Sequence, residues 1–263
     1  MPLRELRAVR ILMQKKILII NANTDLACTK RQEEACRRIA YPGISVRAVS
    51  PDVTSTFDVP SIKCEVDNAL ATVETLKVVA REQENCDGII LACFSDTGLD
   101  AAREMTEIPI LGIAETSYII ACLIAHKFSV LTYTKKFTPP KEKALRALGL
   151  NLRVASLRYY DDTRNAEERI RSSAQLVKQC AEEDGAEAVI LGGGGFAGFG
   201  PAISEAAGDI VPVIDPTTAT FSVMEALLSL GLSHSKAGMW QKIIPATIDG
   251  RSYVRPFDIS GSV

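Results

Sequence analysis

Two short apolar runs stand out in the pattern of hydrophobic and polar positions along the chain. One begins at residue 88 and the other follows 100 residues later, at residue 188. Each run ends in small residues and leads into a loop, as a buried parallel strand does at its carboxyl end. Open α/β sheets bind their ligands at that end. We therefore expect functional residues in the two loops, at 93–99 and 192–199.

Strands and helices are predicted to alternate through both halves of the chain. The segments 108–111 and 211–214 match at a spacing of 103 residues, close to the spacing of the first pair. Two elements that recur at nearly the same offset indicate two pseudo-symmetric βα lobes. The expected fold class is α/β, with two parallel-sheet lobes and the active site in the cleft between them. Further strands are expected at 16–20, 44–50, 108–113, 128–132, 152–157 and 210–214.

Three helix predictions are specific enough to be checked. Thr29 and Gln32 have the spacing of a capping box, after which Ile39 should face the core. Thr97 together with Asp100 is expected to cap a later helix. The clearest amphipathic pattern belongs to a helix that starts near residue 62. Its predicted core face consists of Ile62, Val66, Ala69, Leu70, Val73, Leu76 and Ala80.

The lobes are expected to share the chain unequally. Lobe one is assigned residues 14–115 together with about 217–263, and lobe two about 116–216. Residues 1–13 are basic, and their apolar stretch is too short for a secretory signal. Two interpretations fit them: a disordered arm, or an artefact of the choice of start site with Met13 as the true start, and we favour the second.

Composition narrows the class of protein. The chain of 263 residues is 47% apolar with a net charge of −2, and no basic cluster has the density of a nucleic-acid interface. No apolar run approaches the roughly 20 residues of a membrane span. The seven cysteines form no CxxC pair and no Cys/His pair at metal spacing. We expect a cytoplasmic protein in a reducing compartment, with no metal, nucleic acid or membrane partner.

Cys93 is the main catalytic candidate. A thiol at the end of a buried strand, just before a helix, is near backbone N–H groups that favour the thiolate. It can then act as a nucleophile or a general base. The alternative is a small buried hydrophobe. The polar residues Ser95, Asp96 and Thr97 favour the functional interpretation, because a core strand seldom leads straight into three polar residues.

The second loop contains four consecutive glycines. Gly193, Gly194 and Gly195 offer N–H groups to an anion or an oxyanion, although a tight turn explains them as well. The loop lacks the Lys-Ser/Thr of a phosphate-binding loop.

Polar residues follow other predicted strands. Asn23 is placed to hold a carbonyl or carboxylate, or to cap a helix. Glu115, Thr217 and Thr218 follow strands in the two lobes. The two histidines, His126 and His234, lie at no predicted strand end, which argues against a Cys–His dyad and a metal site.

These segments together resemble the aspartate/glutamate/hydantoin racemase superfamily, and within it the hydantoin and allantoin racemase branch. The matching segments lie at 17–24 (Ile-Leu-Ile-Ile-Asn-Ala-Asn-Thr), 93–99 (Cys-Phe-Ser-Asp-Thr-Gly-Leu), 112–115 (Gly-Ile-Ala-Glu) and 191–198 (Leu-Gly-x-x-Gly-x-Ala-Gly). The resemblance covers 16–231 and implies a cofactor-free enzyme in which two thiols flank the substrate's Cα. It implies that Cys93 is one acid/base and that Asn23 and the amides of 95–97 hold the substrate.

The resemblance also places the family's second cysteine on Gly193, which carries no proton to give. Loss of a general acid or base typically costs about 10² to 10⁴ in rate. Three hypotheses follow. The first, which the hydantoin-branch motif favours, is a racemase or epimerase acting beside a carbonyl, with water, Thr217 or Thr218 in place of the thiol. The second is a one-thiol decarboxylase or isomerase similar to arylmalonate decarboxylases, in which Cys93 protonates the enolate. The third is a non-catalytic small-molecule binder.

Each hypothesis implies a small-molecule partner with a carbonyl or carboxylate. Because relatives of this kind commonly assemble, a homo-oligomer is expected.

Overall fold

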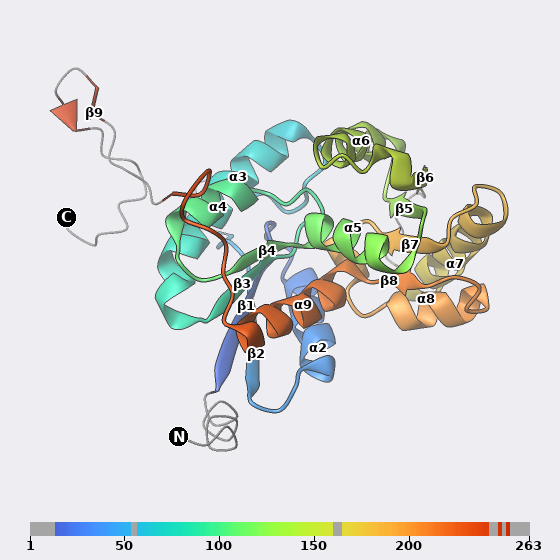
Figure 1. The fold of residues 1–263 in the computed structure, drawn as a ribbon, viewed down its shortest axis with the longest axis horizontal. Helices are drawn as coiled ribbons and strands as arrows, with labels where there is room; N and C mark the ends of the chain where they lie inside the picture. Colours follow the sequence, from blue (N-terminus) through green and yellow to red (C-terminus); the bar gives the residue numbers. More distant parts are fainter. Residues whose placement is uncertain (1–13, 54–56, 160–164, 242–246, 249–250, 253–263) are drawn as a thin grey trace.

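Two four-stranded parallel sheets form the frame of the computed structural model (Figure 1). The structure describes residues 14–53, 57–159, 165–241, 247–248 and 251–252, so the predicted extension at 1–13 lies outside the described residues. The first sheet has the order β2-β1-β3-β4 and the second the order β6-β5-β7-β8. This arrangement confirms the predicted α/β class.

The strands of the first sheet are β1 (Lys15–Ile20), β2 (Ile44–Val49), β3 (Gly88–Leu91) and β4 (Ile110–Gly112). Those of the second are β5 (Phe128–Thr132), β6 (Val154–Tyr159), β7 (Ala188–Leu191) and β8 (Val213–Ile214). The helices between them are α2 (Leu26–Ile39), α3 (Glu65–Glu82), α4 (Leu99–Met105), α5 (Ile113–Ile124), α6 (Thr138–Ala147), α7 (Ala166–Glu182), α8 (Gly200–Ala207) and α9 (Pro216–Leu230). A short antiparallel pair, β9 (Thr247–Ile248) and β10 (Arg251–Ser252), lies beyond them.

The two sheets repeat one another in register as well as in strand order. In the first sheet Ile20 of β1 is level with Leu91 of β3, and in the second Leu131 of β5 is level with Leu191 of β7. All residues of β3 and β7 are buried, as expected for central strands covered on both faces. The carboxyl ends of the central strands are therefore equivalent points in the two lobes.

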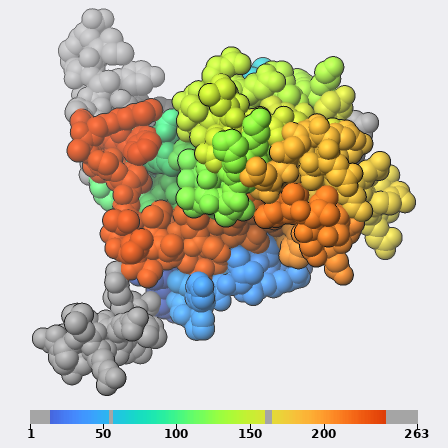
Figure 2. Space-filling view, turned by 45° about the vertical axis from the view of Figure 1, so that its right-hand side comes forward, coloured from blue at the N-terminus to red at the C-terminus, as the bar shows by residue number. Residues whose placement is uncertain are grey.

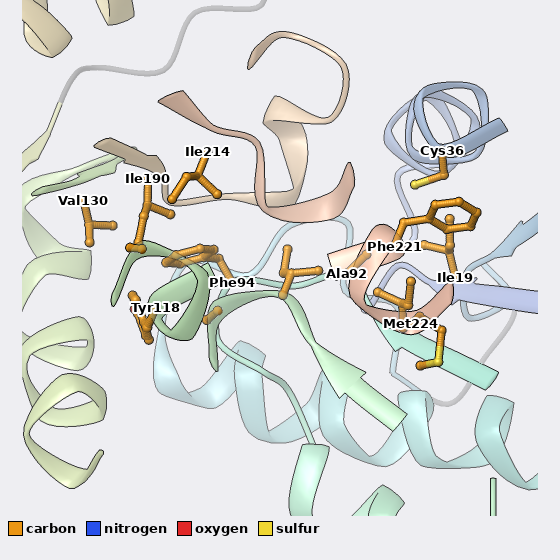
Figure 3. Close-up of a cluster of buried hydrophobic side chains, with 14 of the residues drawn as sticks. Ile19, Cys36, Ala92, Phe94, Tyr118, Val130, Ile190, Ile214, Phe221 and Met224 are labelled. Carbon is orange, nitrogen blue, oxygen red and sulfur yellow. The ribbon is translucent and has the colours of Figure 1, made fainter. Parts of the chain in front are cut away.

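One apolar cluster runs through both lobes. It includes Ile19 from the first sheet, Ile190 from the second, and Phe221 from α9 (Figure 3). Helix α9 packs against α2 and α5, and in Figure 2 it forms a band between the segments that contain them. The lobes therefore share a core. The predicted lobe boundaries near 115 and 216 stay a prediction.

Two predicted helix starts are wrong. Helix α2 begins after Asp25, whose carboxylate accepts hydrogen bonds from the backbone N–H groups of residues 27 and 28, so Thr29 is already inside the helix. Ile39 is 44% exposed rather than in the core, because it ends the helix beyond the sheet contact. Helix α4 follows Gly98, whose φ of 75° is left-handed, and Thr97 instead donates to Asn68.

The core face of α3 also differs from the prediction. Of the predicted face only Leu76 is buried, whereas Val66 is 67% exposed. The helix starts at Glu65, so Ile62 precedes it. The face that packs on the sheet is rotated, because the adjacent pair Val78 and Val79 enters the core. The buried residues of α3 are Ala71, Glu74, Thr75, Leu76, Val78, Val79 and Glu82.

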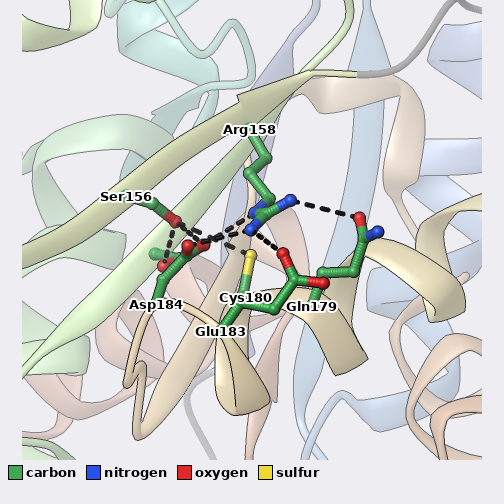
Figure 4. Close-up of polar contacts among 7 residues, drawn as sticks. Ser156, Arg158, Gln179, Cys180, Glu183 and Asp184 are labelled. Carbon is green, nitrogen blue, oxygen red and sulfur yellow. Dashed lines mark hydrogen bonds and ion pairs between the residues drawn. The ribbon is translucent and has the colours of Figure 1, made fainter.

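An ionic network ties the edge strand β6 to the end of α7 (Figure 4). Arg158 on β6 donates to Asp184 at 2.6 Å and to Glu183 at 2.6 Å, and Ser156 donates to the same Asp184 carboxylate at 2.6 Å. The guanidinium holds the pKa of Asp184 below its usual range. The network therefore anchors the edge of the second sheet to α7.

The segment after α9 returns to the first lobe. The Trp240 indole donates to Asp100 at 3.0 Å, and the Lys236 ammonium donates to the carbonyl of Arg103 at 2.6 Å, so this segment covers α4. Among the described helices, none is both long and apolar enough to cross a membrane.

Candidate functional site

A cleft of about 1260 Å³ lies at the carboxyl ends of the strands of both sheets. The segments that follow β1 and β3 line it from lobe one, and those that follow β5 and β7 line it from lobe two. Both predicted loops thus face one cavity. The lining includes Asn23, Cys93 and Ser95 on one side and Tyr133 with residues 192–195 on the other.

Cys93 opens a tight turn directly after β3. Its carbonyl accepts a hydrogen bond from the N–H of Asp96 at 2.9 Å, which folds the loop back over the strand end. Gly193 opens the equivalent turn after β7, where its carbonyl accepts from the N–H of Phe196 at 3.1 Å. The thiol is half-buried and lines the cavity.

Lys141 reaches the Cys93 loop from the other lobe. Lys141 lies on α6. Its ammonium donates to the Phe94 carbonyl and to the Ser95 hydroxyl (3.4 Å), and it lies 5.1 Å from the centroid of the Phe94 ring. The residue is only 5% exposed. Burial lowers the pKa of Lys141, while the electrostatic interactions with Cys93, Asp96 and Glu65 oppose that shift. The Lys141 side chain therefore lies against the loop that carries Cys93.

Asp96 holds the Cys93 loop against α5. Its carboxylate accepts hydrogen bonds from the backbone N–H groups of Ala114 (2.9 Å) and Glu115 (2.7 Å) at the start of that helix. Burial raises the pKa of Asp96 to about 6, although both hydrogen bonds oppose the shift. Asp96 has a left-handed φ of 46°, an uncommon backbone for this residue type. It positions the loop and does not line the cavity.

Gln32 joins the two loops across the lobes. Its side-chain amide donates to the carbonyl of Ala92 at 3.2 Å and to the carbonyl of Gly194 at 3.4 Å. A Cβ on Gly194 would lie 2.3 Å from the Ala92 carbonyl oxygen, so the loops are in direct contact there. Gln32, predicted as part of a capping box, instead sets the relative position of the two strand ends.

The described lining of the cleft is rich in cations. Arg169 on α7 donates to the carbonyl of Gly195 at 3.1 Å, and the guanidinium groups of Arg31 and Arg169 lie 6.0 and 5.6 Å from the centroid of Phe199. Lining cations are Arg31, Lys63, Lys136, Lys141 and Arg169, against the single carboxylate of Asp25. Such a lining favours an electron-rich or negatively charged substrate.

Six of the predicted site residues line the cleft: Asn23, Cys93, Ser95, Gly193, Gly194 and Gly195. The Asn23 side-chain oxygen is engaged, since it accepts from Asn21 at 2.8 Å and from the N–H of Asp25 at 3.0 Å. These bonds order the loop after β1, and the role of Asn23 in holding the substrate stays a prediction.

The other five, Asp96, Thr97, Glu115, Thr217 and Thr218, do not line the cleft. Glu115 forms an ion pair with Arg103 at 2.9 Å. Thr217 and Thr218 begin α9, where their N–H groups donate to the carboxylate of Asp215. The structure accounts for these residues by helix ends and ion pairs.

The cleft residues that were not expected from the sequence include Tyr133, Lys141, Arg169 and Cys28. Tyr133 directly follows the predicted strand at 128–132, so its position at a strand end was the available signal. Lys141 and Arg169 lie in helices with ordinary charge patterns. Cys28 is buried on α2, and burial raises the pKa of its thiol to about 11.

The described residues include no group of three or more His, Cys, Asp or Glu side chains arranged to hold a metal ion. Both histidines lie away from the cleft lining. His234 contacts the Thr106 carbonyl at 3.0 Å on the far side of α4.

Residues 17–224 match the family model described as Asp/Glu/Hydantoin racemase. The chain belongs to this family. It is 33% identical to a hydantoin racemase of Paenarthrobacter aurescens over 86% of this chain and 97% of that protein. It is 35% identical to a hydantoin racemase of Pseudomonas sp. (strain NS671) over 84% of this chain and 89% of that protein. Its fold matches an allantoin racemase from Klebsiella pneumoniae with a TM-score of 0.81 and 32% identity, covering 90% of this chain and 97% of that one.

Proposed function

We propose that this member of the Asp/Glu/Hydantoin racemase family is a racemase or epimerase, needs no cofactor, and acts at a Cα next to a carbonyl. The proposed substrate class is hydantoin- or allantoin-like. The observation that carries the proposal is the half-buried Cys93 thiol, which lines a cleft shared by two equivalent strand ends and belongs to the loop that the buried Lys141 ammonium contacts.

The proposed chemistry begins with Cys93 as the base. The thiolate takes the proton from Cα, and the electron pair moves onto the neighbouring carbonyl to form an enolate. Return of a proton to the opposite face gives the other enantiomer. The ammonium of Lys141 stabilises negative charge near the thiol, and the other cations of the lining favour the enolate oxygen.

The size and the lining of the cleft support a compact cyclic substrate. A volume of about 1260 Å³ exceeds what one hydantoin ring fills, so space remains for a substituent. Ser95 and the chain at 192–195 supply polar groups close to Cys93 for the ring carbonyls and N–H groups.

Hydrogen exchange in D₂O tests the proposal. We expect the full chain, given one enantiomer of a 5-substituted hydantoin or of allantoin, to replace the α-hydrogen with deuterium and to abolish the optical rotation faster than an enzyme-free control. In the Cys93→Ser variant, the rate of racemisation should be lower by a factor of about 10² to 10⁴. Cys86→Ser is the matched control, because its thiol donates to the Glu82 carbonyl outside the cleft and serine keeps that bond.

The competing one-thiol reaction gives a different result in the same assay. A decarboxylase releases CO₂ from a disubstituted malonate through Cys93 and leaves the optical rotation of the hydantoin unchanged. Wild-type protein that neither exchanges nor racemises any of these ring substrates would overturn the proposed function.

A further inference from the structure

The space above Gly193 is filled by the ring of Tyr133. A Cβ built on Gly193 would lie 2.1 Å from the ring carbon Cε2 of Tyr133 and 2.4 Å from its hydroxyl oxygen. A Cβ on Gly195 would lie 2.6 Å from the same oxygen. Gly193 itself has an extended φ of −175°, which any residue adopts, so its backbone does not require glycine. Glycine at 193 therefore makes room for the phenol.

Gly193 is the structural counterpart of Cys93. Each follows its central strand by two residues, and the strands have the same register in the two sheets. The preceding residues make equivalent bonds: the N–H of Ala92 donates to the Ile20 carbonyl (2.8 Å) and that of Gly192 to the Leu131 carbonyl (2.7 Å). The Tyr133 hydroxyl thus occupies the place that the internal symmetry gives to a side chain opposite Cys93.

We propose that the phenol of Tyr133 is the second acid/base of the reaction, so that a tyrosine at the end of β5 replaces a side chain missing at the end of β7. This inference rests on the proposed racemase function. In one direction the Cys93 thiolate takes the Cα proton and the Tyr133 hydroxyl gives its proton to the opposite face of the enolate. In the other direction the Tyr133 phenolate takes the proton and the Cys93 thiol gives one.

The surroundings of Tyr133 suit this role. Its ring stacks on Phe196 with centroids 5.4 Å apart and an interplanar angle of 13°, so the phenol is held against the glycine loop. Tyr133 is half-buried and lines the cleft together with Arg169 and Lys136. Tyrosine belongs to the side chains that serve as general acids and bases.

Other side chains that could serve as the second acid/base are less well placed than Tyr133. Thr217 and Thr218 are outside the cleft lining and belong to the start of α9. Cys28 does line the cleft, but it lies on α2 in the same lobe as Cys93, and burial favours its neutral thiol. Tyr133 is the candidate that approaches from the second lobe, at the position equivalent to Cys93.

Exchange and inversion measured separately for each enantiomer test the assignment. The Tyr133→Phe variant removes one oxygen and keeps the ring on Phe196, so the fold should persist. We expect racemisation to fall by about 10² to 10⁴. The enantiomer deprotonated by Cys93 should still exchange its α-hydrogen in D₂O with its configuration retained, whereas the opposite enantiomer should stop exchanging. Cys93→Ser should show the reverse preference.

Tyr118→Phe is the matched control, because Tyr118 is buried outside the cleft lining and its loss should leave both reactions unchanged. Racemisation by Tyr133→Phe at the wild-type rate would overturn the assignment, and so would an equal loss of exchange with both enantiomers, which is what a purely structural role produces. Wild-type protein without any exchange would instead overturn the proposed function itself, so the two failures are distinguishable.

A second test moves the second acid/base from Tyr133 to position 193. Gly193→Cys alone places a Cβ only 2.1 Å from the Tyr133 ring carbon Cε2, so the phenol must move and racemisation should fall at least about tenfold. The double variant Gly193→Cys, Tyr133→Ala clears that space, and its thiol should racemise at least about tenfold faster than Tyr133→Ala alone. A double variant no faster than Tyr133→Ala would contradict the placement of the second acid/base at this point.

Discussion

The loops after β3 and β7 have the same pattern of backbone hydrogen bonds but present different groups to the cleft. Each opens with a residue whose carbonyl accepts the N–H three residues later, and each precedes a short helix. The first loop presents a thiol, and the second presents bare backbone covered by an aromatic ring from a neighbouring strand end. In two related lobes, the side chain that faces the substrate can therefore come from a different strand end, although the strands of the two sheets keep the same register.

The loops are also held in place differently. In lobe one, Asp96 within the loop accepts N–H groups from the start of α5. In lobe two the carboxylate is on the helix side: Asp215 before α9 accepts the N–H of Gly198 in the loop at 2.6 Å. Lobe one thus places a buried carboxylate three residues after Cys93, whereas in lobe two the carboxylate binds the loop at Gly198, five residues after Gly193.

The largest effect is expected from removal of the cation beside the thiol. Lys141→Met deletes the ammonium that contacts Phe94 and Ser95 and keeps the volume of the side chain. We expect exchange at neutral pH to fall by about 10- to 100-fold, because the loop that carries Cys93 loses the group that stabilises negative charge there. Steady-state exchange rates at neutral pH measure this. Lys143→Met, at an exposed position of the same helix, should leave the rate unchanged.

The next prediction compares the two strand ends by the unfolding free energy that is lost when the residue after each strand is substituted. A Cβ on Gly192 would lie 2.3 Å from the Leu131 carbonyl oxygen, a backbone atom that cannot move aside, so Gly192→Ala should cost about 3 kcal/mol of unfolding free energy. The equivalent residue of lobe one is already alanine, and Ala92→Gly should cost only about 1 kcal/mol. Urea denaturation of both variants gives the comparison. Equal costs would show that the strand ends are packed alike.

A smaller loss is expected when the bridge between the loops is removed. Gln32→Leu leaves the carbonyls of Ala92 and Gly194 without their shared donor in a buried place, which should cost about 1 to 2 kcal/mol. Activity should fall as well, because the two loops lose their common anchor. Lys30→Leu, on the exposed face of the same helix, should stay within about 0.5 kcal/mol of wild type by urea denaturation. Similar losses in the two variants would argue against the bridge.

The smallest effect concerns the pH dependence of stability. Because the pKa of Asp96 is raised from 3.8 to about 6 in the folded protein, the folded state binds more protons than the unfolded state between these values. The contribution of Asp96 to stability is therefore present at low pH and lost as the pH rises through about 6. Thermal melts of Asp96→Asn should lack this part of the pH dependence, whereas the exposed control Asp52→Asn should retain it. An unchanged profile in Asp96→Asn would contradict this assignment.

The sequence predicted the frame and half of the site well. The strand ends at 93 and 193 were found because buried parallel strands are apolar runs. The two runs are 100 residues apart, close to the spacing of 103 residues between the segments 108–111 and 211–214, and this repeat indicated the two lobes. The helix faces were predicted less well. Val66 and Ile39 fit an amphipathic pattern yet are exposed, because a helical period alone does not say which of several overlapping apolar stripes meets the sheet.

The residues that complete the cleft were hidden for a different reason. Lys141 and Arg169 belong to helices whose charges resemble any solvated face, and only the folded structure buries them, Lys141 against the Cys93 loop and Arg169 against Gly195. Tyr133 was within reach of the strand-end argument, but nothing local connects it with Gly193, which is 60 positions away. Such pairs depend on the register of β5 with β7, which the chain sets only when the sheet forms.

What the sequence determined by itself about this protein is its α/β frame, its repeat and the place of Cys93, since all three follow from short apolar strands and the residues that end them. What only the tertiary structure decided is which side chains fill the cleft. Side-chain space is settled by neighbours distant in sequence: the ring of Tyr133 occupies the volume above Gly193, and the Lys141 ammonium crosses from one lobe to the other to reach the Cys93 loop.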